Sequence, residues 1–167
     1  MDAQGQVSIE LVFLTGFIVI IVMGITSHLG EDVELNQAMA AARSGAIEGA
    51  NINSFAIYPS GRRDDPFHRY YRETPWLLNP CNVKIIKVDY KNFGFNATHN
   101  KIRIQLRITA SSPILKNSDK NPLGDRINFY ARKSITESFG TSSQTNRFFN
   151  PSFSNRYVFT TADVKWI

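Results

Sequence analysis

The residues best placed for chemistry lie near the start of the chain, at Gly5, Gln6, Ser8 and Glu10. Gly5 ends a short polar leader, and a small residue at that place suits a processing cut. Glu10 is the only formally charged residue from Gln6 to Gly30. A carboxylate at the edge of an apolar helix is costly in lipid unless it is paired or near the interface. A cut after Gly5 would leave the whole apolar helix on the mature protein. The position of Glu10 indicates a special role for its carboxylate; the alternative is that Ser8 and Glu10 only cap the helix.

A long apolar helix must position these groups. No Asp, Glu, Lys or Arg occurs from Leu11 to Gly30. A helix of about 20 such residues, rising roughly 1.5 Å per residue, can cross the hydrocarbon core of a bilayer. We therefore expect a transmembrane segment at about 9–30, with membrane lipid as its first partner. Strong helix formers without proline follow it, so a single helix is predicted over 6–52.

The outer half of this helix carries small residues at four-residue spacing, Ala41, Gly45 and Gly49. Small residues at this spacing let another helix backbone approach closely. The approaching partner is either the same helix in another subunit or the protein's own domain. Both alternatives stay open at this level.

The segment Gln6–Leu11, QVSIEL, resembles the class III signal peptide of archaeal type IV pilin-like proteins. A TadE-like pseudopilin is a sister possibility. The resemblance covers only the first 25 to 30 residues. It implies that a prepilin peptidase cuts between Gly5 and Gln6, and that Gln6, Ser8, Glu10 and Leu11 form the processing and assembly motif. It also implies that Glu10 meets the new N-terminal amine of a neighbouring pilin subunit, and that an assembly ATPase and platform proteins are further partners.

The rest of the chain divides into a proline-rich aromatic connector, 53–82, and a head domain, 83–167. Alternation of apolar and polar residues predicts strands at 83–90 and 101–108, joined by a hairpin loop over 92–100. In the second strand, Ile102, Ile104, Leu106 and Ile108 are expected to face inward, and Lys101, Arg103, Gln105 and Arg107 outward. Further strands are expected at about 127–136 and 156–165, with a loop over 137–151. The predicted fold is α+β, with a long N-terminal helix and an antiparallel β-rich, pilin-like head that could be a β-sandwich.

Two shorter motifs bear on modification and metal binding. Asn96-Ala97-Thr98 is an N-glycosylation sequon at the predicted hairpin tip, so Asn96 is a candidate site. Residues 119–125 have oxygen ligands at a spacing loosely like that of a calcium loop, but Leu123 and Tyr130 occupy expected ligand positions. A plain turn is the favoured interpretation of that segment.

No group of residues predicts an enzyme. His28, His68 and His99 share no metal-ligand spacing, and Cys81 is the only cysteine. No nucleophile elbow, phosphate-binding loop or dinucleotide motif is present. We therefore expect no catalytic residues, no cofactor and no metal. The formal net charge is +5, which suits either a solvated surface or attraction to acidic envelope polymers, but no Lys/Arg-rich run predicts nucleic-acid binding.

These observations predict a structural subunit, minor or adhesive, of an archaeal type IV pilus-like surface filament. It would be held in the cell membrane by a single pass with its head outside, and it would become extracellular after assembly. The alternative is a single-pass anchored surface domain that never polymerises and binds a ligand through the aromatic connector.

Overall fold

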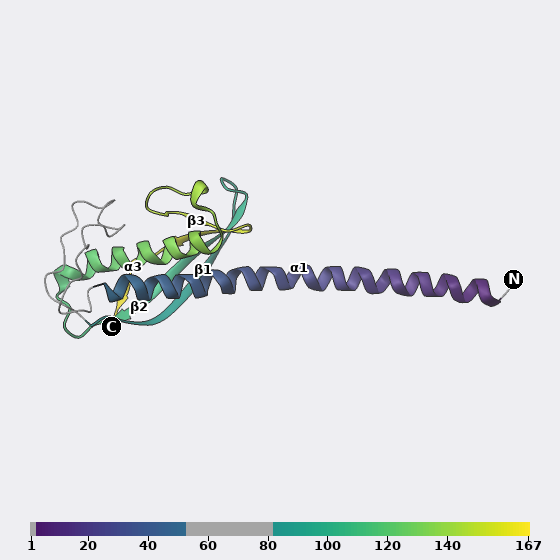
Figure 1. The fold of residues 1–167 in the computed structure, drawn as a ribbon, viewed down its shortest axis with the longest axis horizontal. Coiled ribbons are helices and arrows are strands. Elements are labelled where there is room, and N and C mark those ends of the chain that lie inside the picture. Colours follow the sequence, from purple (N-terminus) through teal and green to yellow (C-terminus); the bar gives the residue numbers. More distant parts are fainter. Residues whose placement is uncertain (1–2, 53–81) are drawn as a thin grey trace. The chain divides into compact units, whose positions relative to one another are not determined.

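The computed structural model describes residues 3–52 and 82–167. They divide into two compact units, one up to Asn36 and one from Gln37 to Ile167. Along the chain the elements are α1 (Ala3–Asn51), β1 (Lys84–Asn96), β2 (Lys101–Ser111), α3 (Asn117–Ser138), the short 3₁₀ helix η2 (Ser142–Gln144), β3 (Ser152–Phe153), β4 (Tyr157–Thr161) and β5 (Lys165–Trp166) (Figure 1). The fold is α+β. The predicted connector, 53–82, lies outside the described residues except for Asn82.

Helix α1 is continuous from Ala3 to Asn51 and covers the range predicted for the long helix. Gly45 and Gly49 lie within it, although glycine costs about 1 kcal/mol of helix propensity relative to alanine. Both glycines belong to the unit that starts at Gln37, where packing compensates for this cost. Over the described parts of the chain, no helix combines the length and the apolarity needed to cross a membrane.

The described strands form one mixed sheet in the order β1-β2-β4-β3, with β5 also paired to β2. Strands β1 and β2 are antiparallel, but β4 and β5 both run parallel to β2. The expectation of an antiparallel head or a sandwich is therefore wrong for these residues. The connection from β2 to β4 contains α3 and the two-residue strand β3, which is antiparallel to β4. A tight hairpin would have made neighbouring strands antiparallel, whereas a long connection that includes a helix allows β4 to lie beside β2 in the parallel direction.

Residues 127–136 lie within α3 and do not form the predicted strand. Their β-branched and aromatic side chains favoured a strand, yet the buried residues Leu123, Ile127, Ala131 and Ile135 recur every four positions. That period places them on one helix face. The expected plain turn at 119–125 is also part of α3. The helix ends in a Schellman motif, in which Thr141 donates to the Thr136 carbonyl at 3.0 Å and Gly140 has a φ of 63°.

The β1–β2 hairpin is longer than predicted. Strand β1 continues to Asn96, with register shifts at Ile85/Lys87 and Asn92/Phe95, so that only residues 97–100 form the turn. The predicted fourth strand, 156–165, is divided into β4 and β5. The alternation predicted for β2 is confirmed: Ile104, Leu106 and Ile108 are buried, and Arg103 and Arg107 are exposed.

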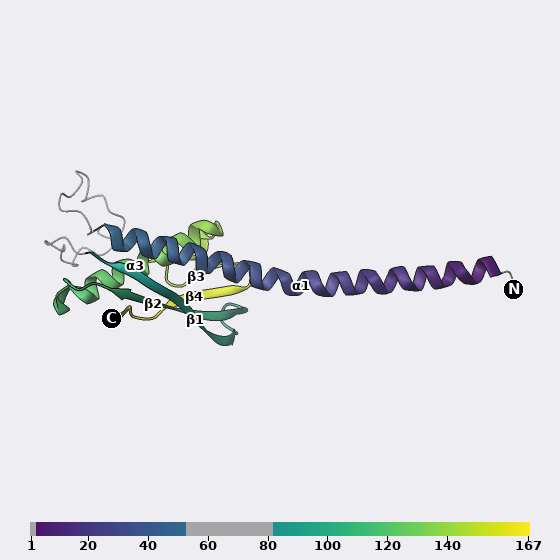
Figure 2. The ribbon, with the colours of Figure 1, turned by 90° about the horizontal axis from the view of Figure 1, so that it is seen from below.

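The core of the Gln37–Ile167 unit lies between the sheet and two helical segments. The buried face of β2 and the β4 residue Phe159 contribute from the sheet. Helix α3 and the last turns of α1 lie side by side over the sheet (Figures 1 and 2). They run antiparallel, since Gln37 contacts Ser138 while Gly49 contacts Arg126.

Candidate functional site

Helix α1 contains the whole predicted processing and assembly motif. Gly5, Gln6 and Ser8 are helical in backbone, and their side chains lie outside the described part. Glu10 and Leu11 follow on the same helix and are exposed, with Leu11 at 63%. The structure therefore places Glu10 in the solvent-accessible surface at the start of the apolar stretch.

The apolar side chains that follow Glu10 are exposed on every face of the helix. Leu11, Val12, Phe13 and Leu14 occupy four successive positions, each turned about 100° from the last, and each is at least 58% exposed. The apolar residues farther along are 45–68% exposed: Phe17, Ile18, Val19, Ile20, Ile21, Val22, Met23 and Ile25. A helix that is apolar all round is typical of burial in a large core or in lipid. An exposed apolar surface of this extent needs a partner.

The small residues of α1 contact α3 of the same chain. Ala38, Ala42, Ala46 and Ala50 are 0–1% exposed. A Cβ added at Gly45 would lie 2.2 Å from the Tyr130 carbonyl oxygen, and one added at Gly49 would lie 3.1 Å from that of Arg126. Ala41 is half-buried beside them. Of the two alternatives for this face, the structure shows packing on the protein's own domain.

The candidate glycosylation site Asn96 is the last residue of β1, where the hairpin turn begins. Its side chain is half-buried, and its Oδ1 accepts a hydrogen bond from the Thr98 backbone N–H at 2.9 Å. Thr98 is exposed in the turn. Asn96 therefore lies at the hairpin tip, as predicted, and its Oδ1 accepts a hydrogen bond from the backbone of the turn.

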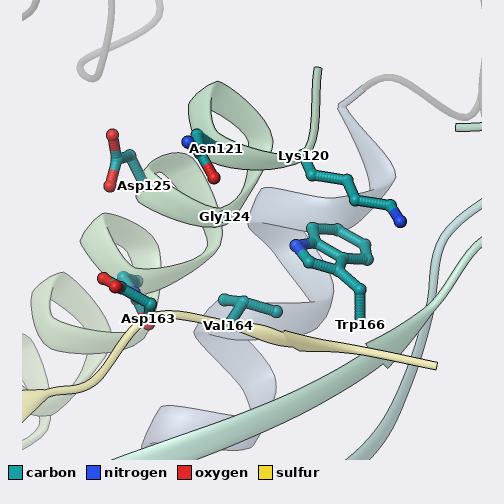
Figure 3. A pocket seen from close by; sticks show the side chains of 8 residues that line it. Lys120, Asn121, Gly124, Asp125, Asp163, Val164 and Trp166 are labelled. Atoms are coloured by element: carbon teal, nitrogen blue, oxygen red, sulfur yellow. The ribbon is translucent and has the colours of Figure 1, made fainter. Parts of the chain in front are cut away.

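A polar cavity that the sequence did not reveal lies between α3 and the segment joining β4 to β5. It measures about 200 Å³ and is lined by Lys120, Asn121, Gly124, Asp125, Asn128, Asp163, Val164 and Trp166 (Figure 3). The carboxylates of Asp125 and Asp163 lie on the same side of it. A neighbouring hollow of about 320 Å³ shares Asp125, Asn128 and Asp163 and adds Arg132, Phe148 and Thr161.

The electrostatics of these hollows follow from burial and from the two carboxylates. Desolvation raises the pKa of Asp125, the Asp163 charge raises it further, and Arg132 opposes the shift. Burial lowers the pKa of Arg132 to about 10, so this guanidinium remains charged at neutral pH. It donates from Nε and Nη2 to the Phe148 carbonyl at 3.4 and 3.3 Å, and from Nη1 to the Thr161 hydroxyl.

Asn128 lies between the two hollows and is 6% exposed. Its Nδ2 donates to the Ala162 carbonyl at 2.9 Å, while its Oδ1 has no hydrogen-bond partner among the described residues. The hollows thus present oxygen acceptors to water or to a small polar ligand. Within residues 3–52 and 82–167, no three His, Cys, Asp or Glu side chains gather as a metal site would require.

The remaining candidates are dispersed. His99 packs edge-on against Phe153, with 5.2 Å between ring centroids, which is a structural contact of the hairpin. His68 and Cys81 lie outside the described residues, as does the side chain of His28.

Comparison with known proteins gives no relative from which a function could be inferred. No protein-family model matches the chain, and neither the curated proteins nor the solved structures include a significant match.

Proposed function

We propose that this chain is a structural subunit, minor or adhesive, of an archaeal type IV pilus-like surface filament. The observation that carries the proposal is the apolar surface of α1 from Ile9 to Ile25, exposed on all sides and headed by the single carboxylate of Glu10. A stable chain must cover such a surface with lipid or with other helices. A filament core built from copies of this helix supplies that cover.

The sequence motif gives the order of events. The uncharged run from Leu11 to Gly30, which extends past the residues with described side chains, enters the membrane first, and the head remains outside. A prepilin peptidase then removes residues 1–5. The new amine of Gln6 in one subunit pairs with the Glu10 carboxylate of another, because both charges are costly in an apolar environment until they meet. The assembly ATPase and platform proteins then transfer the helix from lipid to the filament.

The packing of Gly45 and Gly49 on α3 indicates which surface of α1 can contact neighbouring subunits in the proposed filament. Since this small-residue face is filled by the chain's own helix, it is not available to a neighbouring subunit. The contacts between subunits therefore come from the apolar part of α1, and residues 37–51 belong to the head.

The test is whether the chain is a component of filaments. Filaments sheared from cells that express an affinity-tagged chain are imaged after labelling of the tag. The proposal predicts label along filaments or at their tips. Label confined to the cell membrane, in cells that make filaments of their own, would favour the anchored domain that never polymerises.

A further inference from the structure

The face of the sheet turned away from the helices carries a concentration of positive charge. Residues that are paired between neighbouring strands have their side chains on the same face of the sheet. The strand register therefore identifies the residues on the outward face: Arg107 lies opposite Asp89, and Lys165 lies opposite Thr109. The exposed cations at these outward positions come from three strands: Lys84, Lys87, Lys91, Arg103, Arg107 and Lys165. Positions two apart on a strand are about 6.7 Å apart and neighbouring strands about 4.8 Å, so these charges form a compact array.

Little negative charge offsets this array. Among the described strand residues, Asp89 is the only acid at an outward position, and it pairs with Lys87 at 2.8 Å. Between the cations lie uncharged polar side chains, Gln105 and Thr109, which are half-exposed. The dispersed basic residues of the sequence are thus brought together by strand alternation. Such an array attracts polyanions more strongly than any single exposed ion pair would.

The aromatic rings on this sheet face distinguish two classes of polyanion. Phe93 has the Lys91 ammonium 5.0 Å and the Arg103 guanidinium 5.4 Å from its ring centroid. Both cations therefore lie within cation–π distance of the Phe93 ring. Single-stranded nucleic acid is held by bases that stack on free aromatic faces. A second ring on this sheet face, Phe153, is only 6% exposed and has the Lys101 ammonium 5.8 Å from its centroid. Carboxylate-bearing sugars need only cations and hydrogen-bonding groups such as Gln105 and Thr109.

We propose that this cationic sheet face binds an acidic polysaccharide, a polymer rich in uronic acids. The proposal rests on the proposed function only for the position of the head outside the cell, where such polymers occur. It names the chemical class of surface to which an adhesive subunit would attach. The cations pair with the carboxylates, and the side chains of Gln105 and Thr109 bond to the sugar hydroxyls.

The test uses the full chain in a nonionic detergent, with fluorescent polygalacturonate as the probe and binding followed by anisotropy. Raising the salt from about 50 to about 300 mM is expected to weaken binding by about tenfold or more, because charge pairing is screened. The double variant Arg103→Gln/Arg107→Gln is expected to weaken binding by about tenfold at low salt, since it removes two exposed ion pairs. Neutral dextran is expected not to bind.

The matched control is Arg43→Gln/Arg147→Gln, which removes the same charge from exposed residues outside the sheet face. It should change the affinity less than twofold. Equal losses in the two double variants, or no loss in either, would overturn the proposal, as would tighter binding of single-stranded DNA or of anionic lipid vesicles than of polygalacturonate. Because the assay needs neither cleavage nor filaments, its failure leaves the filament proposal standing, and failure to form filaments leaves this one standing.

Discussion

Gly45→Ala is expected to lower the thermal unfolding midpoint of the Gln37–Ile167 unit by about 10 °C, equivalent to roughly 3 kcal/mol. The added Cβ would lie 2.2 Å from the Tyr130 carbonyl oxygen and 2.8 Å from the Ser134 Cβ. The first of these atoms belongs to the α3 backbone, so no side-chain rotation relieves the clash. Helices α1 and α3 would have to separate, exposing part of the core.

Two other glycines of α1 serve as matched variants for this measurement by circular dichroism. At Gly24 nothing lies within 4 Å of an added Cβ, so Gly24→Ala should leave the midpoint unchanged or raise it slightly through helix propensity. Gly49→Ala, whose closest contact would be 3.1 Å, should fall between the two. An unchanged midpoint in Gly45→Ala would contradict the packing of this face on α3.

Glu10→Val is expected to reduce incorporation into filaments by about a hundredfold or more while leaving membrane insertion intact. In the proposed filament, loss of the carboxylate would leave the Gln6 amine of a neighbouring subunit unpaired in an apolar core, and an uncompensated buried charge costs about 3–5 kcal/mol. Valine also extends the apolar run, so insertion does not suffer. Incorporation is measured as the ratio of the chain in sheared filaments to the chain in membranes.

Glu48→Val is the control for that measurement, because Glu48 is an exposed acid on the same helix within the Gln37–Ile167 unit. Its incorporation should match that of the unchanged chain. If Glu10→Val also matches the unchanged chain, the pairing of Glu10 with the amine is excluded and the non-polymerising anchored domain is favoured.

Strand β2 and helix α3 show what sequence patterns could and could not predict. In β2, every second residue is apolar, so both its structure and its inward face were predicted correctly. In α3, residues such as Ile127, Phe129 and Tyr130 favour a strand when considered alone. The four-residue recurrence of Leu123, Ile127, Ala131 and Ile135 indicates the helix only over a longer window. That error produced the antiparallel topology, because a strand at 127–136 would have separated β2 from the last strand, whereas the helix leaves β4 directly beside β2 and parallel to it.

The cavity could not be predicted for a different reason. Asp125 comes from α3 and Asp163 from the link between β4 and β5, and only the crossover brings them to one wall (Figure 3). The small-residue face of α1 was predicted to pack either on another subunit or on the protein's own domain. The sequence could not decide between these alternatives, because the helix on which this face packs, α3, was predicted as a turn and a strand. By contrast, the role proposed for Glu10 is predicted from its position alone, since a charge beside a long apolar run is energetically exceptional.

The most direct measurement of the central claim is the N-terminal residue of the mature chain. The chain is expressed in archaeal cells that contain a prepilin peptidase, isolated from membranes and filaments, and its terminal peptide is identified by mass spectrometry. Assembly through the N-terminal helix predicts that the chain begins at Gln6, with residues 1–5 removed and Glu10 as its fifth residue. A chain that keeps residues 1–5 in these cells would contradict it.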